Sequence, residues 1–355
     1  MKKVCMIVPS FSAKGGITAV VSGYKNSKLE NIYEIRYIET YSDGGIIKKV
    51  ISAVTAYIKF IYILISWHPD LIHIHSSFGG SFYRKIPFIL LGHMVSIPIV
   101  NHIHGSYYDE FFFQAKESKK KLIRAIFKKC DYFIALSSKA KTELKKIVNE
   151  EKISIIENYG IIHENAVEER KRKSNNHTVL FLGFITEKKG CFDIPSICEL
   201  VANKIPDVKF VLAGVGELEA LKGEITNSLM RHFEFPGWIS GVEKDHQLRN
   251  ADIFLLPSYS EGMPMAILDA MGYGLPIVAT KVGGVPQIVH HNENGYLADP
   301  GEVEHLSEYI IKLLKDEKEL ERCGERSIEI IKERYSIEAH ISKLEEVFRR
   351  MIEKC

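Results

Sequence analysis

The sequence predicts an α/β protein made of two doubly wound, Rossmann-like domains that face each other across a cleft. The chain has 355 residues, which exceeds the usual size of a single domain, about 100–200 residues. Short apolar runs typical of buried strands alternate with helical stretches, as in parallel sheets with crossover helices. A polar, charged stretch interrupts this alternation near the middle of the chain and suggests a domain boundary.

The strand-like runs fall into two groups. The first group comprises residues 4–8, 71–75, 97–102, 132–136 and 153–157, and the second comprises residues 179–182, 208–213, 232–235, 253–256, 276–279 and 295–297. We therefore assign residues 1–163 to an N-terminal Rossmann-like domain and residues 177–336 to a C-terminal Rossmann-like domain, with residues 164–176 as the linker. A last helix, about residues 337–355, is expected to cross back onto the first domain.

Charge is distributed unevenly between the halves. Residues 1–173 hold 27 Lys and Arg against 16 Asp and Glu, whereas the remainder holds 20 against 29. A basic half indicates an anionic partner, such as a phosphate-bearing substrate or an acidic lipid surface. No recognised nucleic-acid-binding module is present, so nucleic acid is not an expected partner.

Cysteine usage and the N-terminus indicate a cytoplasmic location. The six cysteines form no Cys-x-x-Cys pair, which is typical of reduced thiols. Met-Lys-Lys is followed by an apolar run that ends at Pro9, too short for the core of a signal peptide.

Two segments raise the question of membrane contact. Residues 50–67 are apolar except for Lys59 and a few hydroxyl residues, which fits a helix packed in a core, a helix lying on a surface, or a short spanning helix. Residues 109–130 join Phe111-Phe112-Phe113 to a lysine-rich amphipathic pattern. That pattern suits a bilayer interface, or a solvated helix with a buried apolar stripe.

Candidate site residues of the first half follow strands. Gly15 and Gly16 allow close approach of a ligand to the backbone, before a helix whose N-terminal amides can bind an anion. His73 and His75 share one face of a strand, but no third ligand of suitable spacing stands nearby, so no metal site is predicted. His104 sits where its strand gives way to a loop, at the ligand-binding edge of the sheet.

In the second half, Lys189 lies just beyond a strand and next to a glycine, where it can pair with a pyrophosphate. Glu261 lies in a loop before a helix, where a carboxylate can hydrogen-bond sugar hydroxyls. The amides of Met265 and Ala266 begin that helix and can bind phosphate. Asp269, further along the same helix, can accept hydrogen bonds from a ribose.

Together these residues resemble the retaining glycosyltransferases of the GT-B fold usually called family 4. The resemblance covers nearly the whole chain and is densest from Pro257 to Met271. It rests on Gly15-Gly16, residues 69–75, His104-Gly105, Asn158, Lys189-Gly190, Gly214-Val215-Gly216, Pro257 through Pro264, Asp269-Ala270-Met271, residues 274–280 and residues 283–286.

The resemblance implies an acceptor-binding role for the N-terminal domain, residues 1–163, and a nucleotide-sugar-binding role for the C-terminal domain, residues 177–336. It also implies roles for single residues. Gly15, Gly16 and Lys189 would contact the donor pyrophosphate, together with the loop and helix start at Gly262, Met263, Met265 and Ala266. His104 and Glu261 would flank the transferred sugar, with His104, Glu261 and Lys189 as catalytic residues. Asp269 would hold the ribose.

Three positions depart from the family pattern. Phe184 stands where the family commonly has arginine, Asp269 replaces the second glutamate of its E-x7-E pattern, and Gln287 replaces a glutamate. These changes put efficiency and donor choice in question.

The implied activity is transfer of a sugar, with retention of configuration, from a UDP- or GDP-sugar to a lipid-linked saccharide acceptor during surface polysaccharide synthesis (O-antigen, capsule or exopolysaccharide). No Asp-x-Asp motif is present, so no divalent metal and no tightly bound cofactor are expected. The expected location is the cytoplasm, with peripheral contact on the anionic inner face of the membrane. The alternatives are a sugar-nucleotide 2-epimerase and a non-catalytic, degenerate transferase that acts as a binding or scaffold protein.

Overall fold

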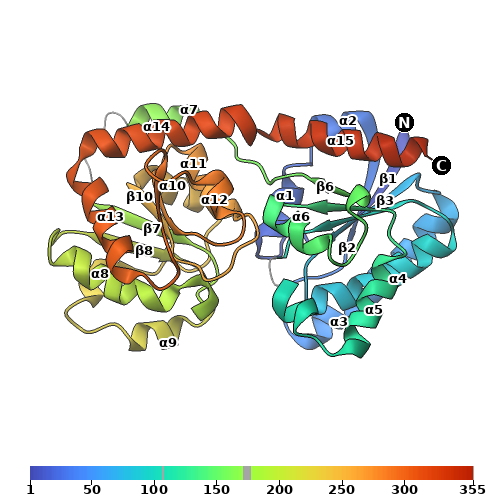
Figure 1. The fold of residues 1–355 in the computed structure, drawn as a ribbon, viewed down its shortest axis with the longest axis horizontal. Helices are drawn as coiled ribbons and strands as arrows, with labels where there is room; N and C mark the ends of the chain where they lie inside the picture. The colour runs from blue at the N-terminus through green and yellow to red at the C-terminus, as the bar shows by residue number, and fades with distance from the viewer. Residues whose placement is uncertain (106–107, 171–176, 355) are drawn as a thin grey trace. The chain divides into compact units, whose positions relative to one another are not determined.

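The computed structural model describes residues 1–105, 108–170 and 177–354, and they form two compact units (Figure 1). The first unit comprises Met1–Asn158 with Ile337–Cys355, and the second comprises Tyr159–Ser336. Each described unit contains one six-stranded sheet whose paired strands are all parallel. The predicted α/β class with two Rossmann-like domains is therefore confirmed.

The sheet of the first unit has the strand order β2-β1-β3-β4-β5-β6. Its strands are β1 (Lys2–Val8), β2 (Tyr33–Glu39), β3 (Leu71–Ser76), β4 (Ile99–Ile103), β5 (Tyr132–Ala135) and β6 (Ile153–Ile155). Every residue of β3, β4 and β5 is buried, as expected for parallel strands covered on both faces. Strand β2, which was not among the expected runs, is an edge strand, so several of its side chains remain exposed and its apolar signal is weak.

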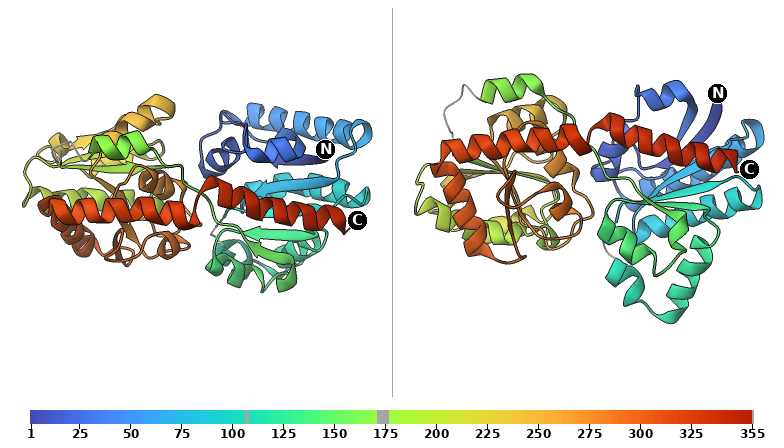
Figure 2. Two further views of the ribbon diagram at one scale, coloured as in Figure 1. Left: turned by 90° about the horizontal axis from the view of Figure 1, so that it is seen from above. Right: turned by 45° about the horizontal axis from the view of Figure 1, so that its top comes forward.

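Helices cover this sheet. They are α1 (Gly16–Ser22), α2 (Lys28–Ile32), α3 (Ile46–Ser66), α4 (Gly80–Met94), η1 (Asp109–Phe113), α5 (Glu117–Phe127), α6 (Ser138–Leu144), η2 (Glu150–Lys152) and the C-terminal α15 (Ile337–Glu353). Both views of Figure 2 show α15, in dark red, beside the strands and helices of the first unit, and it packs against α2 and β3.

The sheet of the second unit has the order β12-β11-β10-β7-β8-β9. Its strands are β7 (Thr178–Leu182), β8 (Lys209–Ala213), β9 (Phe233–Glu234), β10 (Ile253–Leu256), β11 (Ile277–Thr280) and β12 (Gly295–Ala298). Its helices are α7 (Glu164–Arg170), η3 (Glu187–Lys189), η4 (Cys191–Asp193), α8 (Ile194–Ala202), α9 (Leu218–Gly223), η5 (Met230–His232), α10 (Gly241–Asn250), α11 (Met265–Gly272), α12 (Val285–Ile288), α13 (Val303–Lys315) and α14 (Glu317–Arg334).

The first part of the predicted linker is helical instead. Residues 164–170 form α7, which packs against α10, buries Ala166, and accepts a 2.9 Å hydrogen bond from Arg249 at Glu169. Glu, Ala and Arg favour helix, but the stretch has no apolar period in the sequence, so its helix could not be recognised from the pattern. Residues 171–176 of the predicted linker lie outside the described residues.

The two segments considered for membrane contact differ from each other. In residues 109–130, Phe111, Phe112, Ile123, Ile126 and Phe127 are all buried in the core of the first unit. The apolar stripe of this stretch is therefore buried, while lysines such as Lys121 and Lys128 are exposed. Residues 50–66 lie within α3, and Trp67 is its C-cap. Most of the apolar side chains of α3 are exposed, so it is a surface helix rather than one enclosed in a core.

Candidate active site

The second unit brings Lys189 and Glu261 into contact. Lys189 ends η3, in the loop after β7, and Glu261 lies in the loop after the neighbouring strand β10. Lys189 Nζ donates a hydrogen bond to Glu261 Oε1 at 2.6 Å, and Ser258 Oγ donates to the same oxygen at 2.7 Å. The glutamate side chain is only 6% exposed and the lysine 27%. A buried carboxylate is thus paired with a cation that solvent and ligands can reach.

Two glycines allow the loops around this pair to approach one another. A Cβ on Gly190 would lie 2.0 Å from the carbonyl oxygen of Pro257, and a Cβ on Gly283 would lie 1.6 Å from that of Glu261. Both glycines have positive φ, at 66° and 55°. Each position therefore excludes a side chain for steric and conformational reasons.

Substitution of Gly283 by alanine is expected to displace the Glu261 loop. The methyl group cannot be placed beside the Glu261 carbonyl, so we expect a loss of about 2 kcal/mol or more in the free energy of unfolding, together with weaker nucleotide binding. Denaturant unfolding and a nucleotide titration measure both effects. Gly223→Ala is the control, because its Cβ would meet nothing within 4 Å. Equal behaviour of the two variants would contradict the packing argument.

Helix α11 begins beside Glu261 and carries three of the predicted donor-binding positions, Met265, Ala266 and Asp269. Its N-cap, Pro264, makes no side-chain capping hydrogen bond, so the amides at Met265 and Ala266 have the orientation that binds anions. Gly262 and Met263 precede this helix start. The chain folds tightly here because Gly284 N donates to Gly262 O at 2.6 Å.

Asp269 has a partner that sequence analysis did not find. Its carboxylate accepts a hydrogen bond from Nζ of Lys244 on α10, and both side chains are partly exposed. The two residues lie 25 positions apart on different helices, and no sequence motif indicates that they pair. A ribose bound by Asp269 would therefore also be within reach of an ammonium group.

Phe184 occupies the position where a cation was expected. Its side chain is 39% exposed, and its ring lies against that of Trp238, with centroids 5.4 Å apart. This edge of the second unit thus offers an aromatic surface in place of a guanidinium.

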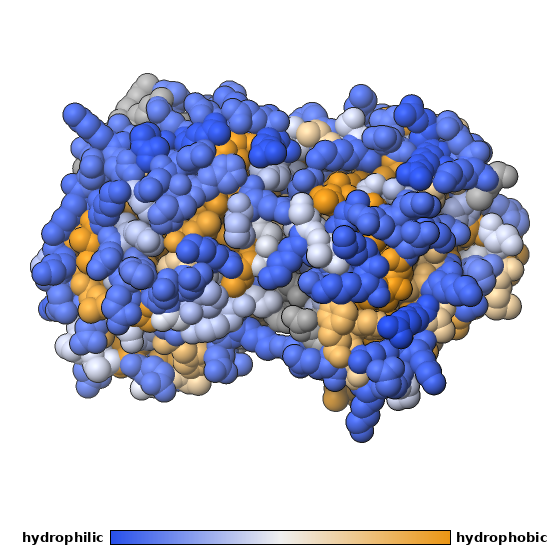
Figure 3. Space-filling view, viewed as in Figure 1, coloured by the Kyte–Doolittle hydropathy of each residue, from blue (hydrophilic) through white to orange (hydrophobic). Residues whose placement is uncertain are grey.

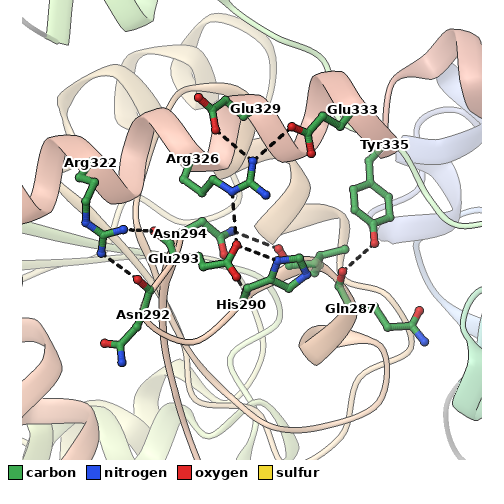
Figure 4. A network of polar contacts seen from close by, with 11 residues as sticks. Gln287, His290, Asn292, Glu293, Asn294, Arg322, Arg326, Glu329, Glu333 and Tyr335 are labelled. Atoms are coloured by element: carbon green, nitrogen blue, oxygen red, sulfur yellow. Dashed lines mark hydrogen bonds and ion pairs between the residues drawn. The ribbon is translucent and has the colours of Figure 1, made fainter.

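Gln287, the third departure, enters the local hydrogen bonding through its backbone. Tyr335 donates to the carbonyl oxygen of Gln287 at 2.6 Å, while the amide side chain points away from this contact (Figure 4). The loop that follows is attached to α14 by Arg322, which donates to the carbonyl of Asn292 at 2.8 Å, and by Arg326, which contacts Glu293. The network supports the loop without using the Gln287 amide.

The first unit places Gly15, Gly16 and His104 at one edge of its sheet. The glycines follow β1, and His104 follows β4, so all lie at the carboxyl ends of parallel strands. Gly15 has a φ of 142° and precedes α1. His104 is half-buried, and a 2.8 Å hydrogen bond joins its Nε2 to Nδ1 of His75.

His104 belongs to a cluster of five imidazoles, which we call the histidine cluster. Its members are His73 and His75 on β3, His102 and His104 on or after β4, and His340 on α15. Burial lowers the pKa of His104 and of His73 to about 3 and that of His340 to about 4, with neighbouring imidazoles adding to the shift for the first two. His104 is therefore a neutral group at pH 7, suited to hydrogen-bonding a sugar rather than to carrying charge.

The third imidazole near the His-x-His strand was missed by sequence analysis. His75 pairs in register with His102 of β4, and ligand atoms of His73, His75 and His102 lie within 4.8 Å of one another. Two zinc–nitrogen bonds of about 2.1 Å cannot span the full 4.8 Å. In the described conformation the trio would have to close up before it could bind an ion.

Lys85 is a further buried group that sequence analysis did not single out. Its side chain is almost inaccessible, and Nζ donates to Thr40 Oγ1 at 2.6 Å. Burial, aided by the charge of Arg84, lowers the pKa of Lys85 well below its ordinary value. The sequence of α4 did not indicate that this lysine would be buried.

Each unit is a parallel sheet covered by helices, and a lysine–carboxylate pair and a helix N-terminus lie at the carboxyl edge of the second sheet. Two such units are typical of glycosyltransferases of the GT-B fold. The model described as "Glycosyl transferases group 1" matches residues 163–330, and the one described as "Glycosyltransferase Family 4" matches residues 17–159. The chain belongs to the group 1 glycosyltransferases of the family 4 type.

Curated relatives agree with this assignment. A 2-deoxystreptamine N-acetyl-D-glucosaminyltransferase of Niallia circulans is 35% identical over 39% of this chain, and the match spans only 36% of that relative. The UDP-Gal:alpha-D-GlcNAc-diphosphoundecaprenol alpha-1,3-galactosyltransferase of Escherichia coli is 25% identical over 80% of this chain and 76% of its own length.

Solved structures share the fold. Sucrose-phosphate synthase of Thermosynechococcus elongatus superposes with a TM-score of 0.83 at 16% identity over the full length of both chains. HepE of Anabaena in complex with UDP-glucose gives a TM-score of 0.75 at 16% identity, covering 99% of this chain and all of HepE. These likenesses confirm the GT-B fold.

Proposed function

We propose that this protein transfers a sugar from a UDP- or GDP-sugar to a saccharide acceptor with retention of the anomeric configuration. The observation that carries the proposal is the Lys189–Glu261–Ser258 arrangement beside the start of α11. It joins a cation that a ligand can reach, a buried carboxylate and the backbone N–H groups at the N-terminus of α11. These are the groups that bind a sugar diphosphate. The E. coli relative uses a UDP-sugar, as its name states, and HepE was solved with UDP-glucose.

In the proposed mechanism, Lys189 and the α11 amides stabilise the charge that develops on the departing nucleotide diphosphate. Gly15 and Gly16 add backbone contacts to the pyrophosphate, and Asp269 holds the ribose. The acceptor hydroxyl attacks from the face that the leaving group vacates, and its proton passes to a donor phosphate oxygen. Glu261 and the neutral His104 hydrogen-bond the transferred sugar. These protein groups supply the charge stabilisation without a divalent metal.

The acceptor in this proposal is a lipid-linked saccharide, and the product contributes to a surface polysaccharide. The lipid-diphosphate acceptor named for the E. coli relative supports this choice, as does the basic first half of the chain. The protein would then work in the cytoplasm, in peripheral contact with the anionic inner face of the membrane.

Thermal unfolding with nucleotides tests the donor site directly. We expect UDP or GDP, but not both equally, to raise Tm by several degrees at about 100 times its Kd, in EDTA as well as in magnesium. Lys189→Met should remove most of the shift, because a pyrophosphate loses its cation. Lys222→Met is the control, since that lysine pairs with the neighbouring, exposed Glu219 and lies over the ring of Phe235.

The outcomes separate the competing functions. A shift that requires magnesium would contradict the metal-free mechanism. Binding with isomerisation of the donor sugar would indicate a 2-epimerase. Binding without any donor turnover would indicate the non-catalytic alternative, which Phe184 in place of a cation favours.

A further inference from the structure

Helix α3 exposes an apolar face along its whole length. Nine of its large apolar side chains are between 44% and 81% exposed, namely Ile46, Ile47, Val50, Ile51, Val54, Ile58, Ile61, Tyr62 and Ile65. On a helix with about 3.6 residues per turn these nine positions fall within one sector of about 160°. The space-filling view also shows hydrophobic atoms on the part of the first unit that holds α3, α4 and α5 (Figure 3). Soluble monomers rarely expose a continuous apolar surface of this kind.

The opposite face of α3 is anchored in the core of the first unit. Ala56, Phe60, Ile63 and Leu64 are buried there, and Tyr57 donates a hydrogen bond from its hydroxyl to the carbonyl of Arg84 on α4. The helix is long and apolar enough to cross a membrane, by length and composition. Crossing would expose this core-facing side, so the packing favours a helix that lies in the plane of an interface.

The charged side chains of α3 itself are all lysines. Residues 44–69 contain Lys48, Lys49 and Lys59 and no aspartate or glutamate. Lys48 and Lys59 are exposed and lie beside the apolar sector. Helix α4 packs against both α3 and α5, so the lysine-rich α5 belongs to the same layer of the unit (Figure 1).

This charge pattern selects the partner. A second copy of the chain placed on the same face would bring lysine against lysine, with no carboxylate in residues 44–69 to compensate. Anionic lipid headgroups would neutralise those lysines while the acyl region accepts the isoleucines.

We propose that the exposed face of α3 docks this protein on an anionic phospholipid bilayer, with the helix in the plane of the interface and the lysines of α3 and α5 at the headgroups. The inference deepens the proposed function, on which it rests for its purpose, because a docked enzyme meets a lipid-linked acceptor at the membrane surface. The docking itself requires neither donor nor acceptor.

Sedimentation of the full chain with vesicles tests the proposal. Wild-type protein should bind vesicles of equal parts phosphatidylglycerol and phosphatidylcholine, and bind phosphatidylcholine alone more weakly. Ile51→Glu with Ile58→Glu should lower the partition coefficient at least about tenfold. Lys48→Glu with Lys59→Glu should remove the preference for phosphatidylglycerol. Val242→Glu, at an exposed valine of the second unit, should bind like wild type.

Other results would overturn the inference. Unchanged vesicle binding by the isoleucine variant would place docking elsewhere, and a dimer in solution that the same variant dissociates would make a second copy the occupant of α3. Circular dichroism and the nucleotide Tm shift serve as folding controls. If the isoleucine variant loses vesicle binding but keeps the wild-type rise in Tm with nucleotide, the substitutions have damaged the docking surface and not the fold. A protein that binds vesicles but no nucleotide would instead refute the proposed function.

Discussion

Replacing Glu261 with glutamine is expected to lower the rate of sugar transfer at least about 100-fold, a loss typical of removing one preorganised electrostatic group. The amide keeps the size of the side chain but not the charge that holds Lys189 Nζ at 2.6 Å. Lys189 would then be free to shift away from the position where the leaving diphosphate develops charge. Initial rates of nucleotide release in the presence of acceptor measure the effect.

The paired variant sharpens this prediction. Lys189→Met and Glu261→Gln together should cost little more than either alone, since residues that act as a unit are not additive. Glu219→Gln with Lys222→Met removes an exposed ion pair of the same unit and should leave the rate unchanged. Additive losses in the catalytic pair would show that the two side chains act independently.

Acidification is expected to unfold the first unit well before ordinary acid denaturation. The folded-state pKa values of His73, His104 and His340, about 3, 3 and 4, lie below the value of about 6.5 in the unfolded chain. Burial also lowers the pKa values of His75 and His102. At pH values between the folded and the unfolded pKa, the unfolded chain binds more protons than the folded one. The stability that comes from keeping these histidines neutral is therefore complete above about pH 6.5 and is lost as the pH falls.

The expected loss is large because five groups act together. Between its folded and unfolded pKa, each histidine lowers the free energy of unfolding by up to about 1.4 kcal/mol for each unit that the pH falls. A typical domain has a free energy of unfolding of about 5–15 kcal/mol. We therefore expect the first unit to unfold at about pH 5. Denaturant titrations at a series of pH values between about 7.5 and 5 measure the loss of stability.

A buried variant and an exposed control separate this effect from general acid sensitivity. His73→Leu removes one titrating group and two ring nitrogens that have no hydrogen-bond partner within the described residues. It should flatten the pH dependence of stability and preserve or raise stability at neutral pH. His305→Gln, at an exposed position on α13, should leave the slope unchanged. An unaltered slope in His73→Leu would contradict the assignment.

Much of the fold could be predicted because parallel strands leave continuous apolar runs in the sequence. Gly190 and Gly283 also had recognisable motifs, and the structure gives their physical reason in the contacts with Pro257 and Glu261. The contact of Lys189 with Glu261 joins residues 72 apart and follows from the adjacency of β7 and β10. Strand order is a tertiary property, so residue spacing alone could not supply it.

The residues that were missed share this dependence on tertiary contacts. Lys244 reaches Asp269 only because α10 lies beside α11, and His102 joins His73 and His75 only through the register of β3 with β4. Composition also could not predict that α3 is exposed, since an apolar helix has the same sequence pattern whether its outer face contacts protein or solvent. The roles of the site residues remain predictions that the variants above test.

The return of α15 to the first unit has a consequence for biosynthesis. Phe348 is fully buried against His73 and Tyr33, and His340 donates or accepts hydrogen bonds with Tyr24 and the carbonyl of Glu157. A ribosome makes the strands of this unit first and the segment that completes their core last. The whole second unit precedes α15 in the chain, so it can emerge while the first unit still lacks this helix. Nascent chains stalled before residue 337 should therefore hold an N-terminal half that is still sensitive to protease.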